Sequence, residues 1–336
     1  MRYFCTLFDS FYMSRGLVMY KSLETHCSNF HLYIFAFDEL ALKILRELNL
    51  KHATIVSLKE FENERLLAVK DGRSRGEYCW TCTASTIDYC ISKYNIPHCT
   101  YIDADLCFYG EPGILLDEMA GKSVLITEHN YTPGYDEWKE LSGIYCVQFI
   151  TFFNNEDGLR VLHWWRDKCI EWCFARFEDG KFGDQKYLDD WTTRFPGVHV
   201  LRHIGGGVAP WNVQQFKVTN ESGKWMISAR DGSGKVPLIF FHFHYLKFYD
   251  DKTIDLSHEY DLGDKGVLEL YQDYVKAIRE VNKELESKFR FTPRVQSREK
   301  NSVVYSFARK LYHRYRRRKG FYNVIDMEAF ASGHSY

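Results

Sequence analysis

The sequence predicts an α/β fold in which a mostly parallel, Rossmann-like sheet is flanked by helices and followed by a helical, basic C-terminal extension. Two observations predict this class. Apolar, β-branched segments alternate with segments of helical periodicity through the N-terminal part of the chain, and strands separated by helices pair in parallel. Several of the strands also end in aspartate, at the sheet edge where ligands of doubly wound folds bind.

The elements follow from local periodicity and from turn-forming residues. Residues 71–72, Asp-Gly, interrupt an otherwise helical stretch, and residues 130–143, rich in Tyr, Pro and Gly, predict a long loop that lines a site. We expect strands at residues 2–8, 30–37, 53–58, 123–127, 144–152 and 236–248 and directly before Asp103, and helices at residues 15–27, 39–48, 59–95, 156–174, 185–191 and 267–285.

Composition limits the classes of function. The 44 Lys and Arg residues balance 45 Asp and Glu residues, which argues against nucleic acid as the partner. The ten cysteines are irregularly spaced, no secretory signal precedes them, and no apolar run reaches the length of a membrane span. We therefore expect reduced thiols and a cytoplasmic protein. Residues 1–255 are predicted to form the catalytic domain and residues 256–336 the C-terminal extension.

Asp103 and Asp105 are the first candidate metal ligands. They follow an apolar strand and are one residue apart, so their carboxylates project to the same side and can converge on a hard divalent cation. A solvated strand end is an equally good interpretation of the pair alone. Asp9 also follows a strand, and the ends of parallel strands meet at one edge, which favours the metal site.

His242, His244 and Lys247 lie near the end of the predicted strand at residues 236–248. Imidazoles two residues apart on one face can bind a metal, and the ammonium group can meet a diphosphate. Buried histidines are more often structural, but the pairing with a lysine favours function.

Two further candidates have plain structural alternatives. Arg75 begins a helix and is either a phosphate clamp or a solvated arginine. Asp184 stands where an N-cap would precede the helix at residues 185–191, so capping explains it without any function. The glycines at residues 205–207 permit close backbone approach to a ligand.

The C-terminal part carries two amphipathic segments. The first covers residues 267–285, and the second contains a run of basic residues from Arg309 to Lys319. A basic amphipathic helix can lie on anionic lipid, so we expect peripheral contact with the inner face of the cell membrane; a solvated charged face is the alternative.

Together these residues resemble the metal-dependent GT-A glycosyltransferases, and in particular family-8-like enzymes that use nucleotide-diphosphate sugars and act in bacterial surface-polysaccharide synthesis. The resemblance covers roughly residues 1–250. It rests on motifs that occur in the family's order: the first strand ending at Asp9, Asp103-Ala104-Asp105, Gly183-Asp184-Gln185, Pro210-Trp211-Asn212 and His242-Phe-His244-Tyr-Leu-Lys247.

The resemblance implies a glycosyltransferase that uses Mn²⁺ or Mg²⁺ and a nucleotide-diphosphate sugar, with a glycan or glycolipid as acceptor. It implies a UDP-linked donor and a retaining reaction. It implies Thr6, Phe8 and Asp9 at the nucleobase, Arg75 at the diphosphate or donor sugar, Lys247 at the phosphate, and Ala104 among the donor-binding residues. It implies Asp105 as the principal metal ligand, Asp103 at the metal and partly towards the ribose, His242 or His244 as a further metal ligand, and Asp184 and Gln185 as catalytic residues.

Two other functions remain open from the sequence. A sugar-phosphate nucleotidyltransferase shares the sheet and the metal but requires a glycine-rich, basic loop after the first strand, where this chain has residues 7–12, Leu-Phe-Asp-Ser-Phe-Tyr. A carbohydrate-binding protein without catalysis would keep the aromatic residues, which make up 17% of the chain.

Overall fold

A seven-stranded sheet forms the centre of the computed structural model, which describes residues 1–250, 252–297, 312, 314–317, 319–322 and 324–333. The strand order is β3-β2-β1-β4-β7-β6-β8, and β7 runs antiparallel to both of its neighbours. The predicted mostly parallel sheet is therefore confirmed. Its strands are β1 (Arg2–Phe8), β2 (Phe30–Ala36), β3 (Ala53–Ser57), β4 (His98–Ile102), β6 (Val124–Glu128), β7 (Tyr145–Phe153) and β8 (Val198–Val200).

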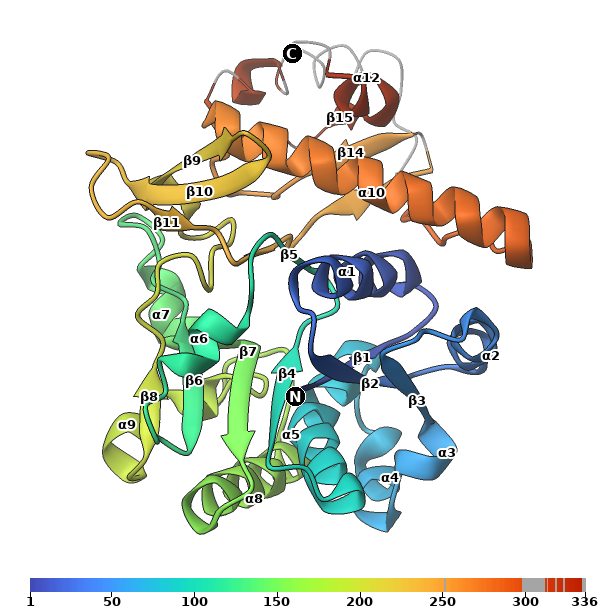
Figure 1. Ribbon diagram of the computed structural model, residues 1–336, viewed down its shortest axis with the longest axis vertical. Helices are drawn as coiled ribbons and strands as arrows, with labels where there is room; N and C mark the ends of the chain where they lie inside the picture. Colours follow the sequence, from blue (N-terminus) through green and yellow to red (C-terminus); the bar gives the residue numbers. More distant parts are fainter. Residues whose placement is uncertain (251, 298–311, 313, 318, 323, 334–336) are drawn as a thin grey trace.

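Helices cover both faces of this sheet (Figure 1). Successive side chains of a strand point to opposite faces, so Phe4 and Phe8 join one core while Cys5 and Leu7 join the other. The first core contains α1 (Met13–His26) and α2 (Glu39–Leu48). The second contains α3 (Leu58–Phe61), α4 (Glu64–Lys70), α5 (Arg75–Tyr94), α8 (Glu156–Glu171) and α9 (Trp191–Arg194).

The long helical stretch predicted at residues 59–95 is three helices. Ser57 and Ser74 each form a capping box, with Glu60 and Glu77 as the respective partners, and these caps begin α3 and α5. The break near residues 71–72 is confirmed between α4 and α5. Arg75 consequently lies in the first turn of α5, beside the carboxyl end of β1, where it reaches Asp9.

The sheet reverses its direction of winding at β1. The chain passes from β1 to β2 and β3 on one side, and β4 pairs with the other side of β1. Ligands of doubly wound folds bind in the crevice outside the carboxyl ends of the strands at such a point. Asp9 follows β1 and Asp103 follows β4 there, as the sequence predicts.

The single strand predicted at residues 236–248 is wrong. The segment forms β11 (Val236–Pro237), β12 (Phe240–His242) and β13 (Lys247–Phe248), with residues 238–239 between the first two and a turn at residues 244–245 before the third. Tyr245 has a left-handed backbone with φ 64°, which a continuous strand does not allow. β12 pairs antiparallel with β5 (Leu106–Phe108), opposing His242 to Leu106 and bringing the histidine segment beside Asp105.

Other segments also differ from the expected elements. The predicted loop at residues 130–143 contains α7 (Glu137–Ser142), and the predicted helix at residues 185–191 is a short 3₁₀ turn, η1 (Lys186–Leu188), followed by α9. A hairpin of β9 (Phe216–Glu221) and β10 (Lys224–Ala229), which the sequence analysis did not predict, pairs with β11. The remaining short elements of this part are α6 (Gly113–Asp117) and η2 (Val213–Gln215).

The C-terminal extension begins with the predicted amphipathic helix, α10 (Lys265–Phe289), which lies across α1 (Figure 1). Its buried stripe, which includes Tyr271 and Tyr274, joins the same core as α1 and β12. The division at residue 255 remains a prediction. Residues 309–311, 313 and 318 of the basic segment from Arg309 to Lys319 lie outside the described residues. The described elements that complete the chain are β14 (Thr253–Asp255), β15 (Ile325–Asp326) and α12 (Met327–Ala331).

Within the described part of the chain, no helix is both long and apolar enough to cross a bilayer.

We expect Asp38 to stabilise the folded protein. It caps α2 through the Ala41 N–H and accepts two hydrogen bonds from Ser10, and it pairs with Arg75. Burial raises its pKa, but these hydrogen bonds and the guanidinium outweigh burial and hold the pKa below its ordinary 3.8. Asp38→Ala should cost about 1–2 kcal/mol of unfolding free energy at pH 7.

Because the folded-state pKa is depressed, the carboxylate's contribution is complete above 3.8 and is lost as the pH falls through the lower folded value. Urea unfolding of both proteins at pH 7, 5, 4 and 3 measures the difference. The difference in unfolding free energy between the wild type and Asp38→Ala should be the same at pH 7 and pH 5 and should decrease below pH 4. A difference of the same size at pH 3 would contradict the prediction.

Candidate active site

A cavity of about 580 Å³ opens at the carboxyl ends of β1 and β4. It is lined by residues from the N-terminal, central and histidine segments, which the fold brings together from distant positions. The residues predicted from the sequence that line it are Phe8, Asp9, Arg75, Asp103, Ala104, Asp105, Asp184, Gln185, His242 and His244.

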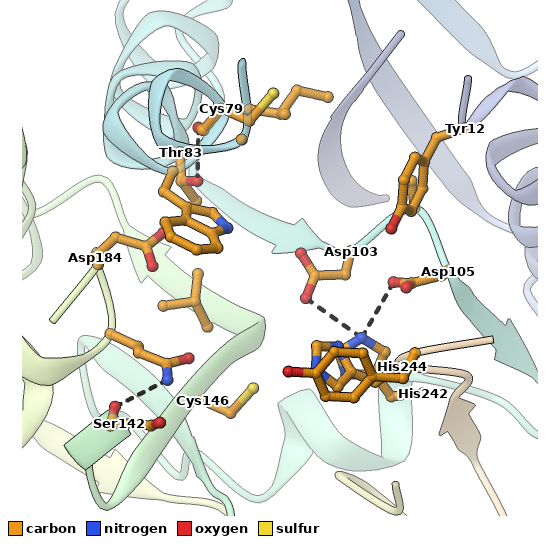
Figure 2. Close-up of a pocket in the computed structure, with 18 of the residues that line it drawn as sticks. Tyr12, Cys79, Thr83, Asp103, Asp105, Ser142, Cys146, Asp184, His242 and His244 are labelled. Carbon is orange, nitrogen blue, oxygen red and sulfur yellow. Dashed lines mark hydrogen bonds and ion pairs between the residues drawn. The ribbon is translucent and has the colours of Figure 1, made fainter. Parts of the chain in front are cut away.

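Asp105, His242 and His244 form the centre of the cavity. One ligand atom from each lies within 4.8 Å of the others, a spacing that allows all three to bind one metal ion. His242 Nε2 is 3.1 Å from Asp105 Oδ1 and 3.8 Å from Asp103 Oδ2, and Figure 2 shows both carboxylates facing this imidazole. Asp105 and His242 are almost completely buried.

Gln148 of β7 fixes the orientation of His242. The His242 Nδ1 atom is 2.8 Å from Gln148 Oε1, an oxygen that can only accept, so Nδ1 carries the proton of this bond. Burial lowers the pKa of His242, but the carboxylates of Asp105 and Asp103 outweigh it and raise the pKa well above its ordinary value; loss of the Nε2 proton would leave a lone pair on the side of Asp105. A hydrogen bond from the second ring nitrogen is the usual support of a metal-bound histidine.

The charges of the centre also suit a cation. Burial, together with the charge of the neighbouring His242, lowers the pKa of His244 to about 3, so His244 is a neutral imidazole at pH 7. Burial raises the pKa of Asp105, but His242 outweighs it and keeps this carboxyl ionised. Two imidazoles with one or two carboxylates are a ligand set that can hold a divalent metal ion.

Asp184 lies across the cavity from the two histidines (Figure 2). Burial raises its pKa to about 7, with a further contribution from the negative charge of Asp103. The capping alternative is wrong: the residue at the N-cap position of η1 is Gln185, and it forms no side-chain cap. A buried carboxyl that titrates near neutrality in a cavity is a common feature of catalytic sites.

Gln185 is held by a hydrogen bond from its Nε2 atom to the Ser142 carbonyl oxygen, 2.8 Å away. Ser142 ends α7, in the segment at residues 130–143 that was expected to line a site. That expectation is met by three residues of the segment, Tyr131, Trp138 and Ser142, which line the cavity.

Arg75 lines the cavity but is already paired. Its guanidinium is 2.5 Å from Asp9 and 2.8 Å from Asp38. Asp9 also accepts hydrogen bonds from the backbone N–H groups of Phe11 and Tyr12 and so shapes the turn after β1. Arg75 and Asp9 thus build the wall of the cavity at the end of β1.

Two predicted residues lie away from the cavity lining. Thr6 is fully buried within β1, where its hydroxyl has no hydrogen-bond partner among the described residues. Lys247 lies in β13, and its ammonium group is 5.5 Å from the centroid of the Tyr245 ring. The prediction of one continuous strand did not include the turn at Tyr245, and this turn directs the chain away from His244.

The glycines of residues 205–207 serve packing. A Cβ on Gly205 would be 2.1 Å from the Pro237 carbonyl oxygen, and one on Gly207 would be 2.6 Å from the Thr127 side chain. The close approach inferred from the sequence is to the protein itself. Asn212 completes this support, because its amide donates to the carbonyl oxygens of His129 and Gly207.

Aromatic residues form much of the remaining lining, and most of them were not predicted as site residues. His129 and Tyr131 stack at 4.8 Å, and Trp211 packs edge-on against both metal-site histidines at 5.3 Å. The high aromatic content of the sequence was a signal for such residues, but composition does not distinguish aromatic side chains of the hydrophobic core from those that line the cavity. Trp211 and Tyr245 belong to motifs named from the sequence, although no role was assigned to them; the lining residues that were missed include Tyr12, Trp80, His129, Cys146, Phe182, Tyr260 and Arg294.

Comparison with known proteins identifies relatives in one bacterium and fold-level likenesses elsewhere. No family model matches the chain. Among solved structures, the galactosyltransferase LgtC with donor and acceptor sugar analogues is 11% identical, with a TM-score of 0.45, over 72% of this chain and 87% of that chain. Mouse xyloside xylosyltransferase 1 is 15% identical, with a TM-score of 0.39, over 60% and 84%. Likenesses with TM-scores below 0.5 are too remote to assign a function.

Two curated proteins of Bacillus subtilis strain 168 match most of the chain. The uncharacterized protein YfnD is 29% identical over 291 residues, which are 85% of this chain and 92% of YfnD. The uncharacterized protein YfnF is 31% identical over 294 residues, which are 85% of this chain and 95% of YfnF. At that identity and coverage, the chain belongs to the same protein family as YfnF.

Proposed function

We propose that this protein is a metal-dependent GT-A glycosyltransferase that transfers a sugar from a nucleotide-diphosphate donor to a glycan or glycolipid acceptor. The observation that carries the proposal is the Asp105–His242–His244 group, which lies in a cavity at the switch point of a mostly parallel sheet. Cavities at this position are the usual ligand sites of doubly wound folds.

The charge of the cavity supports a cation as part of the ligand. Four carboxylates line it, those of Asp9, Asp103, Asp105 and Asp184. A diphosphate would be repelled by them unless positive charge is bound between protein and ligand. A divalent ion held by Asp105, His242 and His244, with Asp103 beside them, would supply that charge and stabilise the departing diphosphate as a Lewis acid.

The far side of the cavity suits the sugar. Cleavage of the bond between sugar and phosphate develops positive charge at the anomeric carbon, and an anionic or amide oxygen nearby stabilises that charge. Asp184, which lies across the cavity from His242 and His244, would take this role. Gln185 donates its amide hydrogen to Ser142, which leaves its Oε1 atom free to accept a hydrogen bond from a sugar hydroxyl.

The aromatic lining supports a carbohydrate ligand. Tyr131, Trp138 and Tyr260 lie in one aromatic cluster beside the histidines. The apolar face of a sugar ring packs on such side chains while its hydroxyls bond to polar neighbours. We further propose a UDP-linked donor, a retaining reaction and a role in surface-polysaccharide synthesis at the cytoplasmic side of the membrane. These finer points rest on the sequence motifs and on the basic C-terminal segment.

Isothermal titration calorimetry with UDP, in the presence and absence of Mn²⁺, tests the proposal. We expect binding that requires the metal, because the cavity carboxylates repel a free diphosphate. Absence of metal-dependent binding for UDP, GDP, CDP and ADP alike would refute it.

Turnover assays separate the two other functions. Release of UDP from a panel of UDP-sugars, by hydrolysis or transfer, is expected of a glycosyltransferase. Release of pyrophosphate from a nucleoside triphosphate and a sugar phosphate would instead identify a nucleotidyltransferase. Glycan binding without any donor turnover would identify a carbohydrate-binding protein.

A further inference from the structure

Arg294 lines the candidate active site although it comes from the C-terminal extension. It follows α10 by five residues and is exposed. What it can do there depends on the charges around it, on how its backbone is held and on which other cations reach the ligand. The inference drawn from it rests on the proposed function, a site for a nucleotide diphosphate.

The other candidate cations are already engaged or lie elsewhere. Within the described lining, the basic side chains other than histidine are the guanidinium groups of Arg75 and Arg294. Arg75 is held by Asp9 and Asp38. Lys247, the cation expected at the diphosphate, is outside the lining. Arg294 has no ion pair or hydrogen bond with any described residue, so its donors are available to a ligand.

The backbone on both sides of Arg294 is fixed. Phe291, three residues before it, is buried in the core that contains α1 and β12. Gln296, two residues after it, donates its N–H to the Phe248 carbonyl oxygen at 2.9 Å and accepts from the Asp250 N–H at 3.1 Å. These anchors hold the segment beside β13 and limit the positions that the guanidinium can reach.

We propose that Arg294 binds the diphosphate of the donor. A guanidinium group presents paired N–H donors that match two phosphate oxygens, and such charge-assisted bonds are stronger than neutral ones. Arg294 adds positive charge on the open side of a cavity whose buried side carries the metal ligands. The C-terminal extension is then part of the active site, because it supplies a side chain that contacts the leaving group.

Calorimetry of the full chain with UDP and Mn²⁺ tests this role. Arg294→Gln should weaken UDP binding by about 10-fold or more, the usual loss for one charge-assisted hydrogen bond to a phosphate. Uridine binding, measured by saturation-transfer NMR, should be unchanged because uridine has no phosphate. Arg290→Gln is the matched control: Arg290 is an exposed arginine of the same segment, is not part of the lining, and should bind UDP as the wild type does.

The outcomes distinguish this inference from the proposed function. Tight metal-dependent UDP binding by both wild type and Arg294→Gln would overturn the role of Arg294 alone. An equal loss in Arg290→Gln would also overturn it, since the effect would then be one of overall charge. Absence of UDP binding by the wild type itself would overturn the proposed function together with this inference.

Discussion

Asp105→Asn should reduce the affinity for Mn²⁺ with UDP by at least about 100-fold and abolish donor turnover, while the fold is retained. A carboxylate oxygen of Asp105 and one nitrogen atom of each of the two imidazoles all lie within 4.8 Å of one another. An amide offers a neutral oxygen of similar size, so the substitution removes the negative charge and changes little else. Losing a ligand from the metal site costs more than losing one of its supporting residues, for which 10- to 100-fold is typical.

Asp103→Asn provides a graded comparison. Asp103 Oδ2 is 3.8 Å from His242 Nε2, while Asp105 Oδ1 is 3.1 Å from it. We expect a smaller loss of metal-dependent UDP binding in Asp103→Asn than in Asp105→Asn. Asp71→Asn, at an exposed aspartate after α4, should have no effect. Near-UV circular dichroism verifies the fold of each variant. Wild-type affinity in Asp105→Asn, or equal losses in both variants, would contradict the assignment.

The sheet and the acidic ends of its strands could be predicted because local pattern encodes them. Residues 2–8 and 30–37 are apolar on both faces, as strands buried between two helical layers must be. The end of such a strand is also the place where the chain reaches solvent. Asp9 and Asp103 could therefore be assigned to one edge of the sheet from the order of the strands.

The cavity lining could not be predicted in the same way, because it depends on pairings between distant segments. The pairing of β5 with β12 brings His242 to Asp105, and no periodicity within residues 236–248 indicates it. The left-handed turn at Tyr245 removes Lys247 from the lining, and a tyrosine gives little warning of such a backbone. Arg294 is added by the path of the chain after α10, across 189 residues from Asp105.

Tertiary contacts also connect the C-terminal extension to the Asp105–His242–His244 group. His242 and His244 flank Phe243, whose side chain turns away from the cavity into the core with α10. Its ring stacks on Tyr274 with a centroid distance of 3.7 Å and meets Tyr271 edge-on at 4.9 Å. The positions of His242, at the end of β12, and of His244, just beyond it, therefore depend on a helix that the sequence places in a separate extension.

Phe243→Ala should consequently destabilise the protein by about 3–5 kcal/mol and also weaken metal binding. Phe243 is 1% exposed, so the substitution removes a buried ring and leaves a cavity between β12 and α10. The loss includes the stacking contact with Tyr274. Urea unfolding in EDTA measures the stability without metal, and Mn²⁺ titration of the folded variant measures the effect on the histidines.

Phe177→Ala is the matched control for this variant. Phe177 is 50% exposed and lies in the loop after α8, so its removal should change the unfolding free energy by less than about 0.5 kcal/mol. Phe243→Leu should recover part of the stability because it refills most of the volume. A cost below about 1 kcal/mol in Phe243→Ala would show that α10 does not support the histidine segment. A large cost with unchanged Mn²⁺ affinity would show that His242 and His244 are held by β5 and Gln148 alone.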